Sequence, residues 1–430
     1  MFTRRGYYTL SKDGELLTKP DGSTAQATDV LNAADYAEAD GRGGIYTIHQ
    51  PDIEVDMPLI HVPGISIIPP SAYPYDLYGT DTQSRGTIPF TVTWPAEPVT
   101  LGTLTVTDAA SLAIALATPG VVVTVNAGNY GTLALENDDQ IWLLDDNAVF
   151  SGLTATGRPS RVLINGGVIN PGTGTSINLV VDDFTMRNVN IPAVSTFAFG
   201  IGSTMSHRVA FIHNTVVAQN VAFFTPGATA SDVGAFGSDM IIAANYLQGG
   251  MDPALSGREP ALRVMSNHRT IIVDNRARTG FDGQGTKHTY RSHYGNQDYY
   301  MRRNMNEYGD GIYFQPRANA DPILPSNYMG DHWVYDHLSY YNGPGGVNIG
   351  NAQRNDASDT TWPGRLVVVD NTAYRAVQTD SLGVLDNPGR WRWSIKAGDV
   401  STNNIEFPYQ APPAFNAWLA ADGLPPGADH

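Results

Sequence analysis

Short apolar segments that end in asparagine recur along this chain of 430 residues. The clearest are Ile241-Ile-Ala-Ala-Asn245, Ile271-Ile-Val-Asp-Asn275 and Val367-Val-Val-Asp-Asn371. Successive members lie 23 to 34 residues apart, and the pair Asp336-His337 fills the one place without asparagine. The asparagines of the series are Asn165, Asn188, Asn214, Asn245, Asn275, Asn304, Asn371 and Asn403. Internal repeats of roughly 20 to 50 residues are typical of solenoids.

Each repeat contains short strand-like runs and Gly or Asn turns, which favours a β-solenoid over a helical one. Asparagines stacked at one turn can donate to and accept from the repeats on either side, which satisfies backbone groups that the turn leaves open. The alternative is that asparagine simply marks ordinary turns. The solenoid is favoured because the third residue before most of these positions is apolar. These residues are Phe211, Ile242, Ile272, Met301, Val334 and Val368.

A strand–helix–strand unit precedes the asparagine series. The sequence predicts a helix over residues 107–117, with Thr107 as its N-cap and Pro119-Gly120 after its end. Strands are expected at Leu104–Val106 and Val121–Val125 on either side. This order resembles the opening of right-handed parallel β-helix polysaccharide lyases, in which a short helix plugs the first coil. The resemblance implies an all-β fold, a single-stranded right-handed parallel β-helix, from about residue 102 to 410.

Two domains are expected. Residues 1–97 alternate apolar and acidic side chains around residues 52–57 and then contain many prolines, which predicts a small β-rich domain. The segment Trp94–Pro98 is interpreted as a stiff linker. Residues 98–430 form the second domain, in which an apolar stripe at residues 414–419 predicts a short helix that covers the last coil.

Composition excludes several classes of function. There are 26 Lys and Arg against 42 Asp and Glu, so the formal net charge is −16 and no nucleic-acid partner is expected. The absence of cysteine excludes disulfides and thiol catalysis. We expect no membrane insertion, because no apolar run reaches the ~20 residues of a span. The first residues lack the apolar segment of a signal peptide.

Charged residues cluster in two strand-like segments, Glu259–Val264 and Lys287–His293. Glu259 and Lys287 are 28 residues apart, as are Arg263 and Arg291. If one coil takes that many residues, the four side chains form a two-by-two patch. Residues of equal parity share one face of a strand, so Lys287, Arg291 and His293 are expected on the outer face.

The outer column is expected to continue through later coils. Tyr313 and Gln315 are candidates in the next coil and Asn348 in the one after it. Arginine forks suit carboxylates, whereas Tyr, Gln and Asn suit sugar hydroxyls. His288 and Tyr290 have the opposite parity and are candidates for substrate contact, or for replacing Lys287, if the register slips by one residue. The column predicts a groove for an anionic polysaccharide.

The same segments resemble the catalytic coils of alginate lyases related to chondroitinase B. Arg258-Glu259-Pro-Ala-Leu-Arg263 looks like their Glu-x-x-x-Arg coil, and Lys287 with Arg291-Ser-His293 looks like their downstream Lys and Arg-His coils. The resemblance implies β-elimination on a uronic-acid polymer. In that analogy Lys287 is the base, Arg291 or His293 assists the leaving group, and Arg263 binds the carboxylate. Glu259 positions Arg263 or a Ca²⁺ ion, the one cofactor that the resemblance allows.

Other functions stay open. Glycoside hydrolysis, as in phage tailspikes, needs two carboxylates across a sugar, and Asp282, Asp298, Glu307 and Asp310 are available. A carbohydrate-binding virion adhesin is a third class. Lys287 and Arg291 also fit a solvated charged face, and His293 fits a structural role. We expect an extracellular or virion-associated protein, and the sequence leaves a homo-oligomer open.

Overall fold

The computed structural model describes most of the chain from residue 88 onward, and three short strands before it. The described ranges are 9–10, 16–18, 24–26, 88–172, 175–192, 197–201, 206–225, 237–250, 260–279, 288–293, 295–307, 310–315, 329–341, 350–352, 364–375, 391–393, 398–408 and 410–421. Two compact units divide the chain. The first is residues 1–81 with 416–426, and the second is 82–415 with 427–430. The structure thus divides the chain before residue 82, not at residue 97 as predicted.

The part of the first unit that is described before residue 82 is a three-stranded antiparallel sheet. Its strands are β1 (Thr9–Leu10), β2 (Leu16–Thr18) and β3 (Thr24–Gln26), in that order. The strand expected around residues 52–57 lies outside the described residues.

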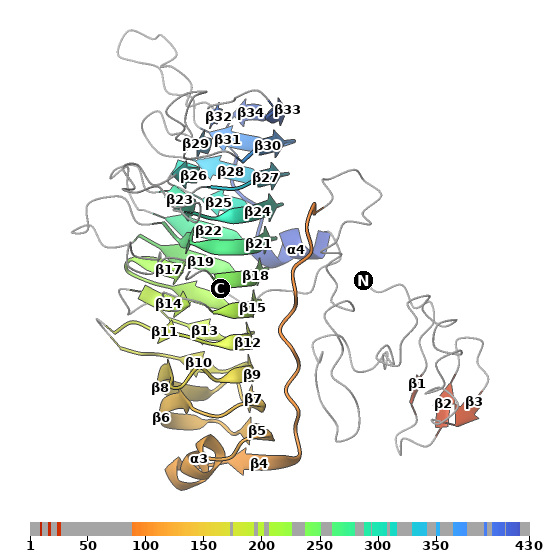
Figure 1. Ribbon diagram of the computed structural model, residues 1–430, viewed down its shortest axis with the longest axis vertical. Helices are drawn as coiled ribbons and strands as arrows, with labels where there is room; N and C mark the ends of the chain where they lie inside the picture. Colours follow the sequence, from red (N-terminus) through yellow and green to blue (C-terminus); the bar gives the residue numbers. More distant parts are fainter. Residues whose placement is uncertain are drawn as a thin grey trace. The chain divides into compact units, whose positions relative to one another are not determined.

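The second unit is built from three long parallel sheets (Figure 1). The twelve-stranded sheet contains β4 (Gly102–Val106), β5 (Val121–Val125), β7 (Gln140–Leu144), β9 (Ser160–Asn165), β12 (Asp182–Arg187), β15 (His207–Ile212), β18 (Gly237–Ala243), β21 (Asn267–Val273), β24 (Gln297–Arg302), β27 (His332–Tyr335), β30 (Leu366–Val369) and β33 (Val400–Thr402). The eleven-stranded sheet contains β6 (Gly128–Leu135), β8 (Ala148–Ala155), β10 (Val168–Ile169), β13 (Asn190–Ile191), β16 (Thr215–Val217), β19 (Tyr246–Gly249), β22 (Arg276–Thr279), β25 (Met305–Glu307), β28 (Leu338–Tyr341), β31 (Thr372–Arg375) and β34 (Ile405–Pro408). The eight-stranded sheet contains β11 (Asn178–Leu179), β14 (Phe197–Ile201), β17 (Val221–Phe224), β20 (Leu262–Met265), β23 (His288–His293), β26 (Asp310–Gln315), β29 (Gly350–Ala352) and β32 (Trp391–Trp393).

From β12 onward the chain visits the sheets in a fixed rotation. It passes through the twelve-stranded, the eleven-stranded and the eight-stranded sheet and then begins again one strand further along. We call one such passage a repeat. Strands of neighbouring repeats pair in parallel, as in β15 with β18 and β18 with β21. The prediction of an all-β fold made of long parallel sheets is confirmed.

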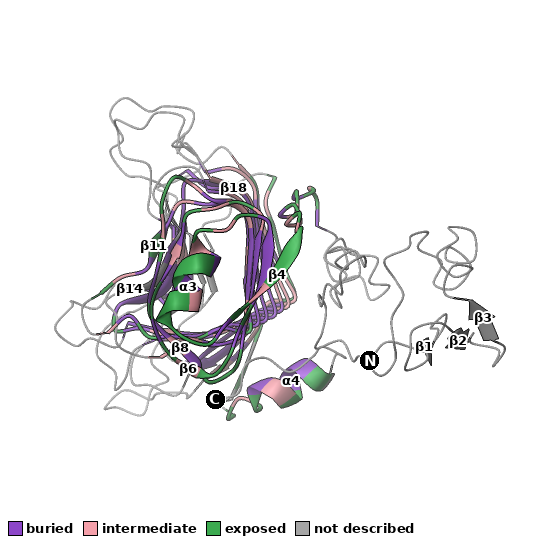
Figure 2. Ribbon diagram, turned by 90° about the horizontal axis from the view of Figure 1, so that it is seen from below, coloured by how far each residue is buried: buried purple, intermediate pink, exposed green. Residues whose placement is uncertain are grey.

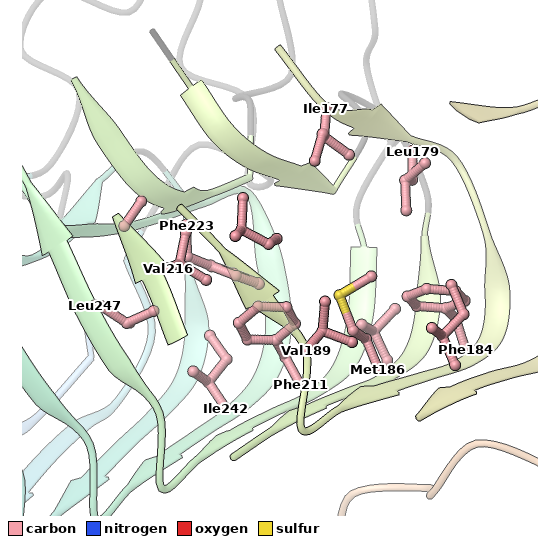
Figure 3. Packing of buried hydrophobic residues seen from close by; sticks show 14 of the residues in the cluster. Ile177, Leu179, Phe184, Met186, Val189, Phe211, Val216, Phe223, Ile242 and Leu247 are labelled. Atoms are coloured by element: carbon pink, nitrogen blue, oxygen red, sulfur yellow. The ribbon is translucent and has the colours of Figure 1, made fainter. Parts of the chain in front are cut away.

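Side chains from all three sheets pack into one apolar cluster (Figure 3). Phe184 and Phe211 come from the twelve-stranded sheet, Val216 from the eleven-stranded and Phe223 from the eight-stranded sheet, and all four are fully buried. We call the face of each sheet that contributes to this cluster its inner face. Burying one such side chain contributes roughly 1.5–3 kcal/mol. The six apolar residues predicted three positions before the asparagines all lie in this core with no exposed surface.

A two-residue turn joins the twelve-stranded to the eleven-stranded sheet in every repeat from β12 onward. The first turn residue has a positive φ, as at His213 (54°) and Asp274 (57°). The second residue is most often a buried asparagine. Asn245 donates from its side chain to the Oδ1 of Asn275 at 2.9 Å, and Asn275 donates likewise to Asn304 at 3.0 Å. This asparagine ladder bonds each repeat to the next one.

The members of the ladder differ from the predicted series at three positions. The ladder residues are Asn214, Asn245, Asn275, Asn304, His337, Asn371 and Asn404. Asn188 and Asn403 instead occupy the positive-φ position one residue earlier, and Asn165 lies two residues before the ladder position. His337 takes the expected place, because its backbone N–H donates to Asn371. Spacing alone leaves an error of one or two residues, because asparagine favours both turn positions.

The helix α3 (Ala109–Leu116) lies across the β4 end of the sheets (Figure 2). Its N-cap is Asp108, one residue later than the predicted Thr107, because Asp108 and Ser111 form a reciprocal capping box. Leu112 is buried, and Gln140 donates to the carbonyl of Ala115 at 3.1 Å. The helix therefore covers the apolar interior at its first strands.

Residues 88–100 form an extended segment that runs alongside the twelve-stranded sheet (Figure 1); we call it the strap. The backbone N–H groups of Thr93, Ala96 and Val99 donate to Asp239, Asp183 and Asp139 at 3.1, 2.8 and 2.9 Å. The predicted linker Trp94–Pro98 is thus part of a packed segment. The strap also buries Ile88, Val92 and Pro95.

The strap matches the spacing of the sheet. Its donors are three residues apart, and its acceptors are on every second strand. Three extended residues span about 10 Å, which is about two strand spacings. The next strand after each acceptor supplies an arginine. Arg161 of β9 binds Asp139, Arg208 of β15 binds Asp183 and Arg269 of β21 binds Asp239, through two nitrogens each.

The strap is expected to loosen as the pH rises from about 5 to 8. Burial raises the pKa of Glu97 from 4.5 to about 7, so its ionisation disfavours the docked strap. The docked strap is therefore most stable below pH 4.5, where Glu97 is neutral, and it loses stability as the pH rises through 7. The bond from Arg161 lowers the pKa of Asp139. The titration of Asp139 therefore changes the stability of the strap only at lower pH. Urea unfolding should show a fall of about 1 kcal/mol over this range, and Glu97→Gln should remove it.

The C-terminal segment runs back to the middle of the eleven-stranded sheet. Arg276 of β22 donates to the carbonyl of Pro413 at 3.2 Å, and the ring of Phe415 lies 6.4 Å from that of Tyr246 in β19. Phe415 begins the helix α4 (Phe415–Ala421). The expectation of a cap over the last coil is therefore wrong for Phe415, which contacts a strand near the centre of the sheet.

Candidate functional site

The eight-stranded sheet is entered and left through connections of very different lengths. One residue separates β20 from β21, whereas sixteen separate β26 from β27. The turn from the twelve-stranded to the eleven-stranded sheet is constant at two residues. Variable connections carry binding and catalytic residues more often than constant ones do. The outer face of the eight-stranded sheet is therefore the strongest candidate for a functional site.

Arg263 and Arg291 are paired directly across β20 and β23. The predicted offset of 28 residues is thus the register between β20 and β23. Leu262 and Val264 flank Arg263 and are fully buried, whereas Arg263 and Arg291 are both partly exposed. The two guanidinium groups consequently share the outer face on neighbouring strands.

An aromatic ring lies beside each of these arginines. The guanidinium of Arg263 is 5.7 Å from the ring centre of Phe224, and that of Arg291 is 5.5 Å from the ring centre of Tyr313. The register places the four residues in the order Phe224, Arg263, Arg291, Tyr313. Rings at this distance attract a cation and hold the guanidinium plane. We call these four residues the arginine column.

The register continues the arginine column to Asn351 in β29 and Arg392 in β32. Asn351 takes the place for which Asn348 was predicted, and Asn348 itself lies outside the described residues. Phe224 was not predicted as a member of the column. Its only signal is the run Val221–Phe224, which ends 39 residues before Arg263 (263 − 224), far from the offset of 28.

Several other predicted residues have only a register position or none. His293 pairs with Met265 and Gln315, and His288 pairs with Asp310. Glu259 and Lys287 lie outside the described residues. Of the predicted two-by-two patch, the structure therefore describes the pair of Arg263 and Arg291.

Tyr290 is not a substrate-binding residue of the outer face, which corrects that prediction. It is fully buried, and its hydroxyl lies 3.0 Å from the carbonyl of Asn275 and 2.9 Å from that of Met305. Burial also raises the pKa of Tyr290 well above its ordinary value. The register does not slip at β23, so the parity argument places Tyr290 inside.

Two of the carboxylates proposed for hydrolysis lie away from the arginine column. Asp298 belongs to β24 of the twelve-stranded sheet, and Glu307 belongs to β25 of the eleven-stranded sheet, where it binds Arg276. Asp310 begins β26 of the eight-stranded sheet. Asp282 lies outside the described residues.

His332 and His337 are core residues. His332 is fully buried between the carbonyl of Gly330 and the hydroxyl of Ser292. His337 is buried against Asn306. Within the described ranges, no group of three His, Cys, Asp or Glu side chains is placed to hold a metal ion.

No protein-family model matches this chain, and no curated protein matches it. In the described part of the chain, no helix is both long and apolar enough to cross a membrane.

Proposed function

We propose that the second unit is a single-stranded right-handed parallel β-helix. Three sheets visited in a fixed rotation support it, because each strand then returns to its own sheet one place further along. Crossovers between parallel strands of one sheet are almost always right-handed. In such a fold the outer faces are long shallow walls, and side chains in register form columns with a spacing of about 4.8 Å.

The wall formed by the eight-stranded sheet binds an anionic polysaccharide in this proposal. The single observation that carries it is the pairing of Arg263 with Arg291, each beside an aromatic ring. Two adjacent guanidinium groups suit carboxylates on a polymer, and aromatic rings suit the apolar faces of sugars. The net charge of −16 makes this pair a local exception on an acidic chain.

The reaction that fits best is β-elimination at a uronic acid, as in the alginate lyases that the sequence resembles. Arg263 binds the carboxylate, Lys287 removes the proton, and Arg291 or His293 assists the leaving oxygen. Glu259 positions Arg263 or a Ca²⁺ ion. An extracellular or virion-associated location suits such a substrate. Adhesion without cleavage is the second candidate, because the arginine column supports binding independently of Lys287.

The test is a panel of alginate, pectate, glycosaminoglycans and bacterial capsules. Elimination produces an unsaturated uronate that absorbs in the near ultraviolet, hydrolysis produces only reducing ends, and adhesion produces neither. Arg263→Gln and Arg291→Gln should each weaken binding of the preferred polymer about tenfold or more. Lys287→Ala should abolish elimination and leave binding intact.

The matched control is Arg365→Gln, which removes an exposed arginine from the twelve-stranded sheet. It should leave affinity unchanged. Equal losses of affinity in all three arginine variants would mean that net charge alone causes the effect, and this would contradict a specific site. Unchanged elimination in Lys287→Ala would move the base to another residue, and affinity unaffected by both column variants would end the proposal.

A further inference from the structure

The side chains that fill the interior of the second unit change from apolar to polar along the repeats. On the inner face of the eleven-stranded sheet, Val216, Leu247 and Ala277 are followed in register by Asn306 and Ser339. All five are buried. Polar side chains in an apolar core are unfavourable unless they find hydrogen-bond partners.

The same change occurs on the other two sheets. In the eight-stranded sheet, Leu262 is followed in register by Tyr290, and Val264 by Ser292. In the twelve-stranded sheet, Met240 is followed in register by Thr270 and then by Tyr299. The polar residues therefore gather on the inner faces of β23, β24, β25 and β28, behind the repeats that carry Arg291 and Tyr313.

One buried pair has more hydrogen-bonding groups than its protein partners satisfy. The Nε2 of His337 lies 2.8 Å from the Oδ1 of Asn306, and both residues have no exposed surface. Burial lowers the pKa of His337 to about 3, so the ring is neutral. Among the described residues, neither the Nδ1 of His337 nor the Nδ2 of Asn306 has a hydrogen-bond partner.

Unsatisfied groups remain in this pair for either orientation of the Asn306 amide. If Asn306 accepts through Oδ1, its two N–H donors and the bare Nδ1 of His337 are left over. If the amide is reversed, its oxygen and an N–H of His337 are left over. At least one donor and one acceptor stay unsatisfied in both cases, and a water molecule supplies both complements.

A third unsatisfied group comes from the facing sheet. The hydroxyl of Tyr299 is buried and has no hydrogen-bond partner within the part of the chain that the structure describes. It interacts electrostatically with Tyr290, whose ring is 5.5 Å from that of His337. Tyr290 thus lies near both Tyr299 and His337.

We propose that this part of the interior binds ordered water through Tyr299, Asn306 and His337. Buried water typically makes about three hydrogen bonds to buried polar groups that the protein leaves open. The site is separate from the proposed polysaccharide site, because its residues lie on β24, β25 and the turn after β27, whereas the arginine column lies on β17, β20, β23 and β26. Its occupancy does not depend on whether the protein binds or cleaves a polysaccharide.

A crystal structure of the full chain at a resolution that shows water tests this directly. Density is expected within hydrogen-bond distance of the Tyr299 hydroxyl and of the His337–Asn306 pair. An empty interior at these atoms would overturn the proposal.

Solution measurements give a second test. The double variant Asn306→Ala, His337→Asn gives both positions residues found in neighbouring repeats, and oxygen-17 relaxation dispersion of water should then count at least one long-lived water fewer. Tyr299→Phe should lower the unfolding midpoint, because it removes a hydroxyl that water satisfies. A raised or unchanged midpoint would mean that the hydroxyl is truly unsatisfied and would contradict the proposal.

Tyr290→Phe is the matched control. Its hydroxyl is bonded to backbone carbonyls, so the variant should lower the midpoint without reducing the count of long-lived water. If the count falls equally in Tyr290→Phe and in the double variant, the lost water is not assigned to His337 and Asn306.

Discussion

Replacing Asn275 by alanine is expected to lower the free energy of unfolding by about 4 kcal/mol. Its side chain donates to the carbonyl of Ile242 at 2.8 Å and to Asn304, and it accepts from the backbone and side chain of Asn245. All these groups are buried. Alanine leaves the N–H of Asn245 and the carbonyl of Ile242 without these partners and without access to water. Urea unfolding followed by circular dichroism measures the change.

Asn165→Ala is the control that separates sequence spacing from structure. Asn165 belongs to the same series in the sequence, yet it lies two residues before the ladder position and its side chain accepts only from exposed Asn188. Its loss should cost less than about 1 kcal/mol. Comparable costs for Asn165→Ala and Asn275→Ala would contradict the ladder as the structure defines it.

The second large effect is expected from the strap. Changing Asp139, Asp183 and Asp239 together to asparagine removes the three charges that hold both the strap and the arginines of the neighbouring strands. Asparagine tolerates the positive φ of these positions (61°, 48° and 59°), so the backbone is retained. Together the changes should cost about 4 kcal/mol of stability. Chymotrypsin cleavage after Phe90 should become about tenfold faster.

Asp331→Asn is the corresponding control, because Asp331 binds Arg365 on the same sheet. It removes one charge from the sheet while leaving the three bonds of the strap in place. Cleavage after Phe90 should then be unchanged. Faster cleavage in this control, or unchanged cleavage in the triple variant, would show that the aspartates do not hold the strap.

Much of the core could be predicted from the sequence, because its inner residues repeat with the turn. The third position before each ladder residue is apolar from Phe211 to Val368, and each of these side chains is buried. The arginine pair could also be predicted, because Arg263 alternates with apolar Leu262 and Val264 and its offset of 28 residues to Arg291 is close to the 29 residues between Asn275 and Asn304. The register position of Asn351 beside Tyr313 could not be predicted, because the eight residues between Tyr341 and Gly350 carry no periodic signal.

The sequence by itself determined the repeats, the inner apolar faces and the 28-residue offset of the two arginines, since these follow from local alternation and constant turn length. Tertiary structure alone decided the strap and the polar interior. Asp183 and Ala96 are 87 residues apart, and His337 and Asn306 are 31 apart. Such bonds depend on which strands become neighbours and on the side to which each turn directs its side chain. No local pattern carries that information, because the connecting segments differ in length from repeat to repeat.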